Sequence, residues 1–323
     1  MRRYNILVTA VGAIVGYGII ASLRQSGFDV HIIGCDIFED AVGQYFADEF
    51  IAAVPAADEN YPCFLKKLID EKKIDLVLFG IEQEISAVYS RMDEFGGYEG
   101  KLVINNPDIL PLCDDKWLTF RWLKDNGLGQ YAIDSVISGE YEELSERFGL
   151  PFLIKPRISR AGKGIASISS GDDFSFYRRK AGNGFMAQRI VGDISHEYTV
   201  GVFGLGDGSF VNEIILRRTL SQEGATAKAW VTEDAGIQIA VDEITKKLKP
   251  LGPTNYQFRR QDERIYLLEI NPRISSSTSI RSAFLYNEAK MCIEYYLEGR
   301  IPEISTVKKG KAIRYISDMV FEL

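Results

Sequence analysis

The sequence predicts an α/β protein that begins with a parallel sheet covered by helices. The first hundred residues alternate short apolar stretches with helical patterns, and parallel strands need such crossover helices. Strands are expected over residues 6–9, 30–36 and 75–79, and helices over residues 19–25 and 61–72. A length of 323 residues allows two or three packed units, since domains commonly run to about 100–200 residues.

Composition narrows the classes of function. The net charge of −7 and the lack of any clustered run of Lys or Arg argue against a general nucleic-acid binder. We expect neither a signal peptide nor a membrane span, and the four widely spaced cysteines predict reduced thiols in a cytoplasmic protein. With only two histidines, catalysis is expected to depend on cations, backbone amides and metal-bound phosphate.

A Gly-rich segment from Gly12 to Gly18 follows the first strand and lets backbone approach a ligand. Asp36 ends the second strand, where a dinucleotide-binding fold places its ribose-binding acid. An NAD-dependent dehydrogenase is therefore one alternative. The glycine spacing is not GxGxxG, which weakens that alternative.

A domain boundary is expected near residue 110. Asp114 or Asp115 is suited to cap a helix that follows it. The apolar face of that helix carries Trp117, Phe120 and Leu123. The predicted units are residues 1–110, 111–190 and 191–323.

A strand over residues 151–156 carries Lys155 and leads into a basic loop containing Gly162 and Gly164, followed by a strand over residues 166–168. A strand, a glycine-containing loop and a second strand can fold over a triphosphate, with backbone N–H groups and one fixed charge facing the phosphates. The pattern is not a Walker A motif. A surface hairpin with scattered cations is the alternative.

A second hairpin is expected over residues 255–271. Successive side chains of a strand point to opposite faces, so Glu269 and Asn271 share one face, with Gln257 roughly opposite on the partner strand. Three oxygen donors without His or Cys suit Mg²⁺ shared with phosphate oxygens. Arg273, at the strand end, is suited to hold a phosphate or carboxylate. An ordinary amphipathic hairpin is the alternative.

These motifs also carry a resemblance to a known family. The residues concerned are Gln257-Phe258 and Leu268-Glu269-Ile270-Asn271-Pro272-Arg273-Ile274-Ser275, with Lys155-Pro156 and its glycine loop upstream. They resemble the metal-binding end and the lid of ATP-grasp ligases, most closely the synthetase domains of carbamoyl phosphate synthetase large subunits. The resemblance covers nearly the whole chain. It implies a Rossmann-like (pre-ATP-grasp) domain, which lines an acceptor pocket without binding a dinucleotide, followed by an ATP-grasp fold with a mobile lid subdomain.

The resemblance implies roles for individual residues. The nucleotide-binding residues would be Lys116, Lys155, Gly162, Lys163, Gly164, Gln188, Arg189, Ile190 and Glu197. The metal ligands would be Gln257, Glu269 and Asn271, the catalytic residues Lys155 and Arg273, and the substrate-binding residues Glu82, Arg217 and Arg281. Backbone groups of Arg189 and Ile190 would meet the adenine edge, and Glu197 the ribose. Gln188 stands where the family usually has Glu, although its amide oxygen can still accept from the adenine amino group.

The predicted activity is that of an ATP- and Mg²⁺-dependent ligase, with one or two ions and Mn²⁺ as an alternative metal. It would phosphorylate a small carboxylate (or a carbamate-type substrate) to an acyl phosphate, which an amine then attacks to form a C–N bond. A non-catalytic nucleotide-binding or regulatory module is the remaining alternative. Family habit suggests a homodimer, and no nucleic-acid or membrane partner is expected.

Overall fold

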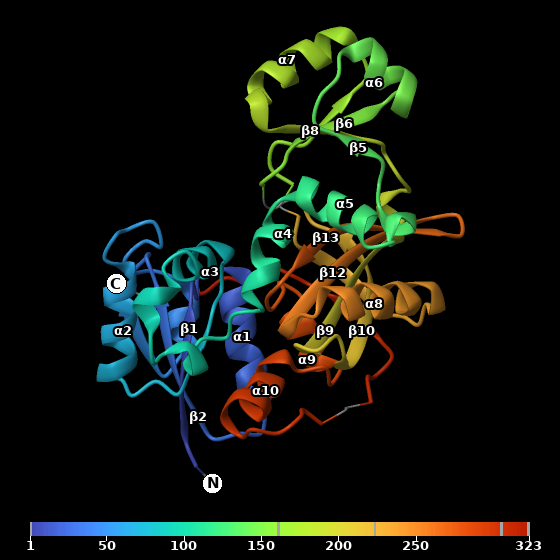
Figure 1. Cartoon of the computed structure of the whole chain (residues 1–323). Coiled ribbons are helices and arrows are strands. Elements are labelled where there is room, and N and C mark those ends of the chain that lie inside the picture. The colour runs from blue at the N-terminus through green and yellow to red at the C-terminus, as the bar shows by residue number, and fades with distance from the viewer. Residues whose placement is uncertain (1, 160–161, 223, 304–305, 322–323) are drawn as a thin grey trace.

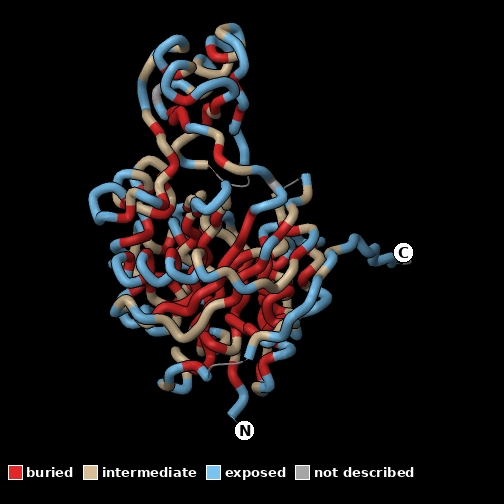
Figure 2. The backbone as a smooth tube through the Cα atoms, turned by 90° about the vertical axis from the view of Figure 1, so that its right-hand side faces the viewer, coloured by how far each residue is buried: buried red, intermediate tan, exposed pale blue. Residues whose placement is uncertain are grey.

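The structure is a computed structural model that describes residues 2–159, 162–222, 224–303 and 306–321. The chain forms a body that holds two sheets, and a smaller subdomain stands on that body (Figure 1). Buried residues lie inside the body and inside the smaller subdomain, and the C-terminal segment is exposed (Figure 2). None of the described helices has the length and apolar character that a membrane crossing needs.

The N-terminal sheet has four parallel strands in the order β3-β2-β1-β4. They are β1 Tyr4–Thr9, β2 Val30–Asp36, β3 Glu49–Ala52 and β4 Leu76–Leu78. Helix α1 (Ile14–Arg24) packs on one face, and α2 (Tyr61–Glu71) and α3 (Glu82–Tyr89) pack on the other. The predicted parallel sheet is confirmed. Strand β3 was not predicted, because it is a short edge strand without a buried position that would produce an apolar run.

The second sheet has six antiparallel strands in the order β13-β12-β9-β10-β11-β14. They are β9 Glu197–Leu205, β10 Phe210–Leu220, β11 Thr226–Val231, β12 Leu251–Gln261, β13 Arg264–Asn271 and β14 Lys311–Ile313. Helix α8 (Ala235–Leu248) buries its apolar stripe against one face of this sheet. The opposite face carries Arg218, Gln257 and Glu269 in one part. In another part it carries apolar side chains such as Phe203 and Leu216, which belong to the core shared with the N-terminal sheet.

Four further helices belong to the described part of the body. They are α4 Leu110–Asp114, α5 Lys116–Asp125, α9 Thr278–Ala283 and α10 Glu288–Cys292. Single 3-10 turns lie at Val42–Tyr45, Met92–Phe95, Glu99–Lys101, Pro107–Ile109, Gly129–Tyr131, Gly182–Gly184 and Ile194–His196, and a π-helical turn at Ile293–Leu297. One core cluster joins Ile6 and Ile19 to Leu216 and Met291, so the N-terminal sheet and the C-terminal helices share a core.

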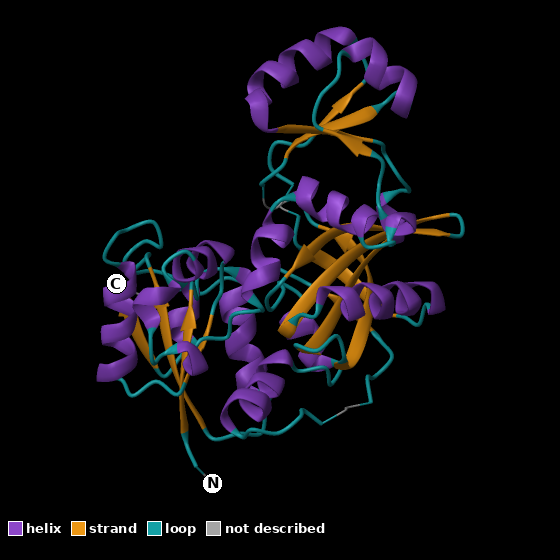
Figure 3. Cartoon of the chain, in the orientation of Figure 1, coloured by secondary structure: helices purple, strands orange, loops and turns teal. Residues whose placement is uncertain are grey.

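We call residues 135–188 the lid. Its four antiparallel strands, in the order β5-β8-β6-β7, are β5 Ser135–Val136, β6 Phe152–Pro156, β7 Ala166–Ile168 and β8 Phe185–Gln188. Helices α6 (Tyr141–Phe148) and α7 (Gly171–Ala181) cover the outer face, and the sheet faces the body (Figure 3). All members of the lid core come from this segment, so its apolar packing is separate from that of the body.

Candidate nucleotide and metal site

The predicted metal-binding side chains lie together on the polar face of the six-stranded sheet. Gln257 pairs directly with Glu269, and Asn255 with Asn271. The register shifts after Gln257, so that Leu268 is an extra residue without a partner. Leu268 lines a small cavity below the lid.

An arginine that the sequence interpretation missed holds part of this face. Arg218 is buried, and its Nη2 donates to Gln257 Oε1 at 2.7 Å and to Glu197 Oε1 at 2.9 Å. Arg217, predicted to bind substrate, is exposed instead and lies over the Trp230 ring at 5.3 Å. Neighbouring residues of β10 point to opposite faces, and Arg218 is the one that pairs with Glu197. The structure therefore places Arg217 on the face away from Glu197 and Gln257, and its role in substrate binding stays a prediction.

Glu197 is buried at the centre of an ion-pair cluster. Its Oε2 accepts from Arg259 Nη2 at 2.7 Å, while its Oε1 accepts from Arg218. A buried carboxylate needs such partners because desolvation of an isolated charge is costly. In this structure the residue predicted to meet the ribose is thus engaged by two guanidinium groups.

Lys155 projects from the lid toward the body, because Phe152 and Ile154 of the same strand fill the lid core. Its Nζ donates to Gln188 Oε1 at 2.7 Å, and Gln188 Nε2 donates to Ser135 Oγ at 2.9 Å. Burial, assisted by the charge of Lys116, lowers the pKa of Lys155 to about 7. A nearby phosphate would favour the charged form.

The bonds around Gln188 change the expected contacts of the nucleotide base. Its carbonyl oxygen, expected to accept from the adenine amino group, already accepts from Lys155. The backbone N–H of Arg189 donates to Asp134 O at 3.0 Å. Gln188 Oε1 and Arg189 N therefore each have a hydrogen-bond partner in this structure. The contact between the backbone of Ile190 and the base stays a prediction.

Lys116 begins helix α5, whose N-cap is Asp115. The Asp115 carboxylate accepts from Trp117 N at 2.8 Å and also pairs with Arg157. Lys116 Nζ donates to Ser159 O at 2.7 Å. A cation at a helix N-terminus is opposite to what the helix dipole favours. The nucleotide-binding role of Lys116 stays a prediction.

The glycine loop between β6 and β7 contains two left-handed backbone positions, Gly162 with φ 69° and Gly164 with φ 78°. A Cβ at Gly164 would also lie 2.8 Å from Pro156 Cγ, so glycine is required there. Lys163, between them, is exposed. Residues 160 and 161 of the same loop lie outside the described residues.

A small cavity separates the lid from the body. Its lining comes from Lys116, Thr119, Phe120, Leu123, Ala132, Ile133, Lys155, Gln188, Leu267 and Leu268. The volume is about 20 Å³, which holds one water molecule but no purine. A nucleotide base that uses this apolar space needs the lid and the body to separate.

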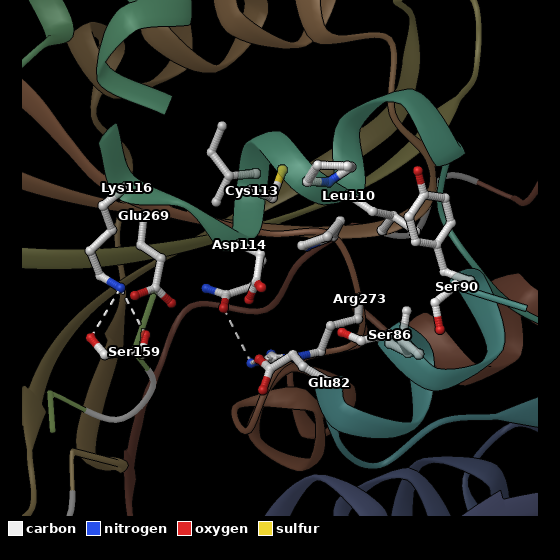
Figure 4. Close-up of a pocket in the computed structure, with 16 residues that line it drawn as sticks. Glu82, Ser86, Ser90, Leu110, Cys113, Asp114, Lys116, Ser159, Glu269 and Arg273 are labelled. Carbon is white, nitrogen blue, oxygen red and sulfur yellow. Dashed lines mark hydrogen bonds and ion pairs between the residues drawn. The ribbon is translucent and has the colours of Figure 1, made fainter. Parts of the chain in front are cut away.

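A larger cavity of about 310 Å³ adjoins the end of β13. Arg273 Nε donates to Glu82 Oε1 at 2.8 Å, and its Nη2 donates to the same oxygen and to Asn271 Oδ1 at 3.2 Å. Figure 4 shows Lys116, Glu269 and Ser159 at one end of the cavity, with Glu82 and Arg273 beside its middle. The N-terminal sheet thus contributes, through α3, to the same site as the metal strand.

Comparison with known proteins gives this geometry a family. A family model described as ATP-grasp in the biosynthetic pathway with Ter operon matches residues 194–319. Residues 194–319 therefore match an ATP-grasp domain. Biotin carboxylase from Campylobacter jejuni superposes with a TM-score of 0.72 at 13% identity, covering 95% of this chain and 74% of that one. The likeness of fold therefore extends from the ATP-grasp domain to the N-terminal sheet and the lid.

Proteins related by sequence have identities of about a quarter with this chain. The formate-dependent phosphoribosylglycinamide formyltransferase of Methanococcus maripaludis is 25% identical over 266 residues, or 78% of this chain and 66% of that protein. The carbamoyl phosphate synthase large chain of Methanoregula boonei is 23% identical over 299 residues, or 85% of this chain and 28% of that protein. The chain spans less than two thirds of the length of each.

One predicted substrate residue lies inside the ATP-grasp domain instead of at its surface. Arg281 is fully buried, and its Nη1 donates to Glu288 Oε1 at 2.8 Å and its Nη2 to Thr199 Oγ1 at 3.1 Å. A Cβ on Gly201 would lie 2.6 Å from Arg281 Nη1, so the guanidinium lies directly on the sheet. The prediction of substrate binding by Arg281 was wrong, and the residue is structural.

Asp36, the residue that suggested a dinucleotide-binding fold, has hydrogen-bond partners within the chain. Asp36 is buried, and its carboxylate accepts from Gly12 N at 2.8 Å and Phe38 N at 3.0 Å. These bonds close the loops that follow β1 and β2. The ATP-grasp fold and this local role together disfavour a dehydrogenase.

The two neighbouring arginines of β10 are expected to differ in their effect on stability. Arg218→Ala should lower the free energy of unfolding by about 1–3 kcal/mol, because it removes a hydrogen bond from buried Glu197 and from Gln257. Arg217→Ala should change it by at most about 1 kcal/mol, the value of an exposed cation–π contact. Urea denaturation of both variants measures the difference. Equal losses would show that Arg218 has no special structural role.

Proposed function

We propose that the chain is an ATP- and Mg²⁺-dependent ligase that joins a small carboxylate to an amine. The observation that carries this proposal is the juxtaposition of Gln257, Glu269 and Asn271 on one sheet face, opposite Lys155 of the lid. An ordinary hairpin gives no reason for three oxygen donors and a buried lysine to converge. The match of residues 194–319 to an ATP-grasp family model and the likeness of fold to biotin carboxylase support the same activity.

The charges around the site suit a triphosphate. The described cations on or above the polar face are Lys116, Lys155, Arg218 and Arg259, and the described carboxylates are Glu197 and Glu269. The electrostatic influence of Lys116, Glu269 and Arg259 reaches Lys155, so these groups act on one region. Because these cations outnumber the carboxylates, the region favours the binding of a polyanion such as a triphosphate.

The donor set fits a hard metal ion. Glu269 supplies one carboxylate, and Asn271 and Gln257 supply amide oxygens. Mg²⁺ is commonly bound by one or two carboxylates together with phosphate oxygens and water, so a single acidic ligand suffices. When bound with the nucleotide, the ion would supply charge neutralisation at the β- and γ-phosphates. These three residues would hold it.

The protein side chains would position the reaction in two steps. A substrate carboxylate oxygen forms a bond to the γ-phosphorus while the bond to ADP breaks, and Lys116, Lys155 and Arg273 balance the charge. The amine nitrogen then bonds to the acyl carbon, phosphate leaves with the bonding electrons, and the nitrogen loses a proton. The acceleration of the reaction would come from the orientation of the reactants and from electrostatic stabilisation of the transition state.

Binding and turnover of Mg-ATP test this proposal. Mg-ATP is expected to raise the melting temperature. At a concentration about a hundredfold above Kd, its binding would add about 2.7 kcal/mol to the free energy of unfolding. Phosphate release should then increase with a suitable carboxylate and amine. Binding of NADH with no response to Mg-ATP would instead support the dehydrogenase. Activity as a homodimer and location in the cytoplasm stay predictions.

The pKa of Lys155 predicts a pH dependence of nucleotide binding. Because the free amine has a pKa of about 7 and phosphate favours its charged form, binding above that pH takes up a proton. Affinity should therefore fall as pH rises from about 7 to 8.5, by as much as roughly tenfold per pH unit. Calorimetry in buffers of different ionisation enthalpy measures the uptake. Lys155→Arg, which stays charged, should abolish it, and an unchanged uptake in that variant would contradict the assignment.

A further inference from the structure

A buried carboxyl group fastens the first turn of α3 to the N-terminal sheet. Glu84 is 6% exposed, and its Oε2 accepts from the hydroxyl of Thr9, the last residue of β1. The same hydroxyl accepts from Gly80 N at 3.1 Å. Because the carboxyl ends of parallel strands meet at one edge of a sheet, these bonds lie at the edge that carries the glycine-rich segment after β1.

Glu84 has no counter-charge in the part of the chain that the structure describes. Asp36, the last residue of β2, is also buried, and its negative charge acts on Glu84. The other titratable groups that face Glu84 are Cys35 of β2 and Tyr61 of α2. Burial raises the pKa of the thiol and of the hydroxyl, so both groups stay neutral. The surroundings of Glu84 therefore carry negative charge but no described positive charge.

This environment favours the protonated form of Glu84. A buried carboxylate without a counter-charge is costly. Burial, reinforced by Asp36, raises the pKa of Glu84 from its ordinary value of 4.5 to about 7, although the Thr9 hydroxyl favours the ionised form. The Tyr61 hydroxyl faces the same carboxyl group and is buried without a well-aligned partner among the described residues. The proton of neutral Glu84 can be donated to it.

The first turn of α3 also contributes to the candidate site. Glu82 accepts from Arg273 Nε at 2.8 Å, and Figure 4 shows the two side chains together. Ile85 and Ser86 line the cavity of about 310 Å³. Glu84 lies between these residues in the sequence and points to the sheet instead. A movement of this turn that lets water reach Glu84 would therefore move the partner of Arg273.

We propose that Glu84 is a pH-sensitive switch that holds the first turn of α3 against the sheet when protonated and releases it when ionised. On loss of the proton, the carboxylate recovers its hydration by local opening of that turn. The contact between Glu82 and Arg273 weakens as the turn opens. The switch depends on the packing of the N-terminal sheet and not on the proposed ligase function.

Hydrogen exchange of the full chain without nucleotide tests the switch. Protection factors, which correct for the intrinsic pH dependence of exchange, should fall by about tenfold between pH 6 and pH 8 in peptides covering residues 82–89. The fall is expected because opening exposes a carboxyl group with an ordinary pKa of 4.5. Peptides covering residues 271–277 should change in the same direction. Helix α6 of the lid, which has a separate core, should show no fall.

Three variants separate the switch from other causes. Glu84→Gln keeps the shape of the neutral acid and cannot ionise, so protection of residues 82–89 should stay within about twofold from pH 6 to pH 8. Thr9→Val removes the hydroxyl that favours the ionised form, so the fall should extend to a higher pH than in the parent. Glu39→Gln is the matched control, because Glu39 is an exposed carboxylate in the loop after Asp36 and should leave the fall unchanged.

Several outcomes would overturn the proposal. Equal protection of the parent at pH 6 and pH 8 would do so, as would a fall of parental size in Glu84→Gln. Loss of the fall in Glu39→Gln would assign the titration to another carboxylate. If Glu84→Gln does not fold, Thr9→Val still decides, because a range of pH that is unchanged or shifted downward contradicts the role of Glu84. A merely structural role of Thr9 would lower protection equally at both pH values.

Discussion

Replacing Glu269 by Ala is expected to lower Mg-ATP-dependent turnover by about 10²–10³-fold, the loss that accompanies removal of one preorganised charge stabiliser. Glu269 is the single carboxylate of the proposed metal set, and Gln257 pairs with it across the hairpin. Without it, two amide oxygens would have to hold a divalent ion beside phosphates. Phosphate release at saturating ATP measures the loss.

Glu263→Ala is the matched control. Glu263 lies in the turn of the same hairpin, and its side chain is fully exposed. The control should keep its turnover within about twofold of the parent, as is usual for a surface change away from a site. Excess Mn²⁺ should recover part of the activity of Glu269→Gln, which keeps an oxygen donor. Near-normal turnover of Glu269→Ala would rule out the metal assignment.

Arg281→Ala is expected to lower the free energy of unfolding by about 3–5 kcal/mol. Arg281 and Glu288 form a fully buried ion pair, and removal of the arginine leaves the Glu288 carboxylate without its counter-charge. Arg281 also donates to Thr199 and Asn255 on the sheet, and those acceptors lose a partner. Urea denaturation followed by circular dichroism measures the change.

Two further variants separate the buried charge from lost packing. Arg281→Met combined with Glu288→Leu removes both charges and should recover much of the stability, because paired buried charges can be replaced by apolar groups at little cost. Arg121→Ala breaks an exposed pair with Asp125 and should cost at most about 1 kcal/mol. A loss below about 1 kcal/mol for Arg281→Ala would contradict the structural role.

The register of the metal hairpin could be predicted to within one residue because it depends on local rules. Alternation of side chains places Glu269 and Asn271 together, and a short turn places Gln257 opposite Leu268 or Glu269. The bulge at Leu268, which was not predicted, makes Glu269 the partner. The orientation of Lys155 follows similarly, since Phe152 and Ile154 occupy the buried face of the same strand. Residues close in the sequence, within one strand or one hairpin, determine both the placement of the metal-binding side chains and the orientation of Lys155.

Other features depend on partners far along the chain and could not be predicted. Alternation requires Arg217 and Arg218 to point to opposite faces, but which one turns inward depends on Glu197 in the adjacent strand. Arg281 was assigned to substrate binding, whereas its burial depends on Glu288 and on the space above Gly201. The contacts that decide the positions of these arginines form only when the sheet and the C-terminal helices are assembled.

The lid is one uninterrupted stretch of chain with a core of its own, and this has a consequence for how the molecule unfolds. Cooperative melting of a whole chain requires apolar contacts that tie its parts together. Among the described residues, the lid core shares no member with the clusters of the body. Without nucleotide, the lid is therefore expected to unfold in a separate calorimetric transition. A bound nucleotide that contacts Lys155 above and Glu269 below would join the two transitions into one.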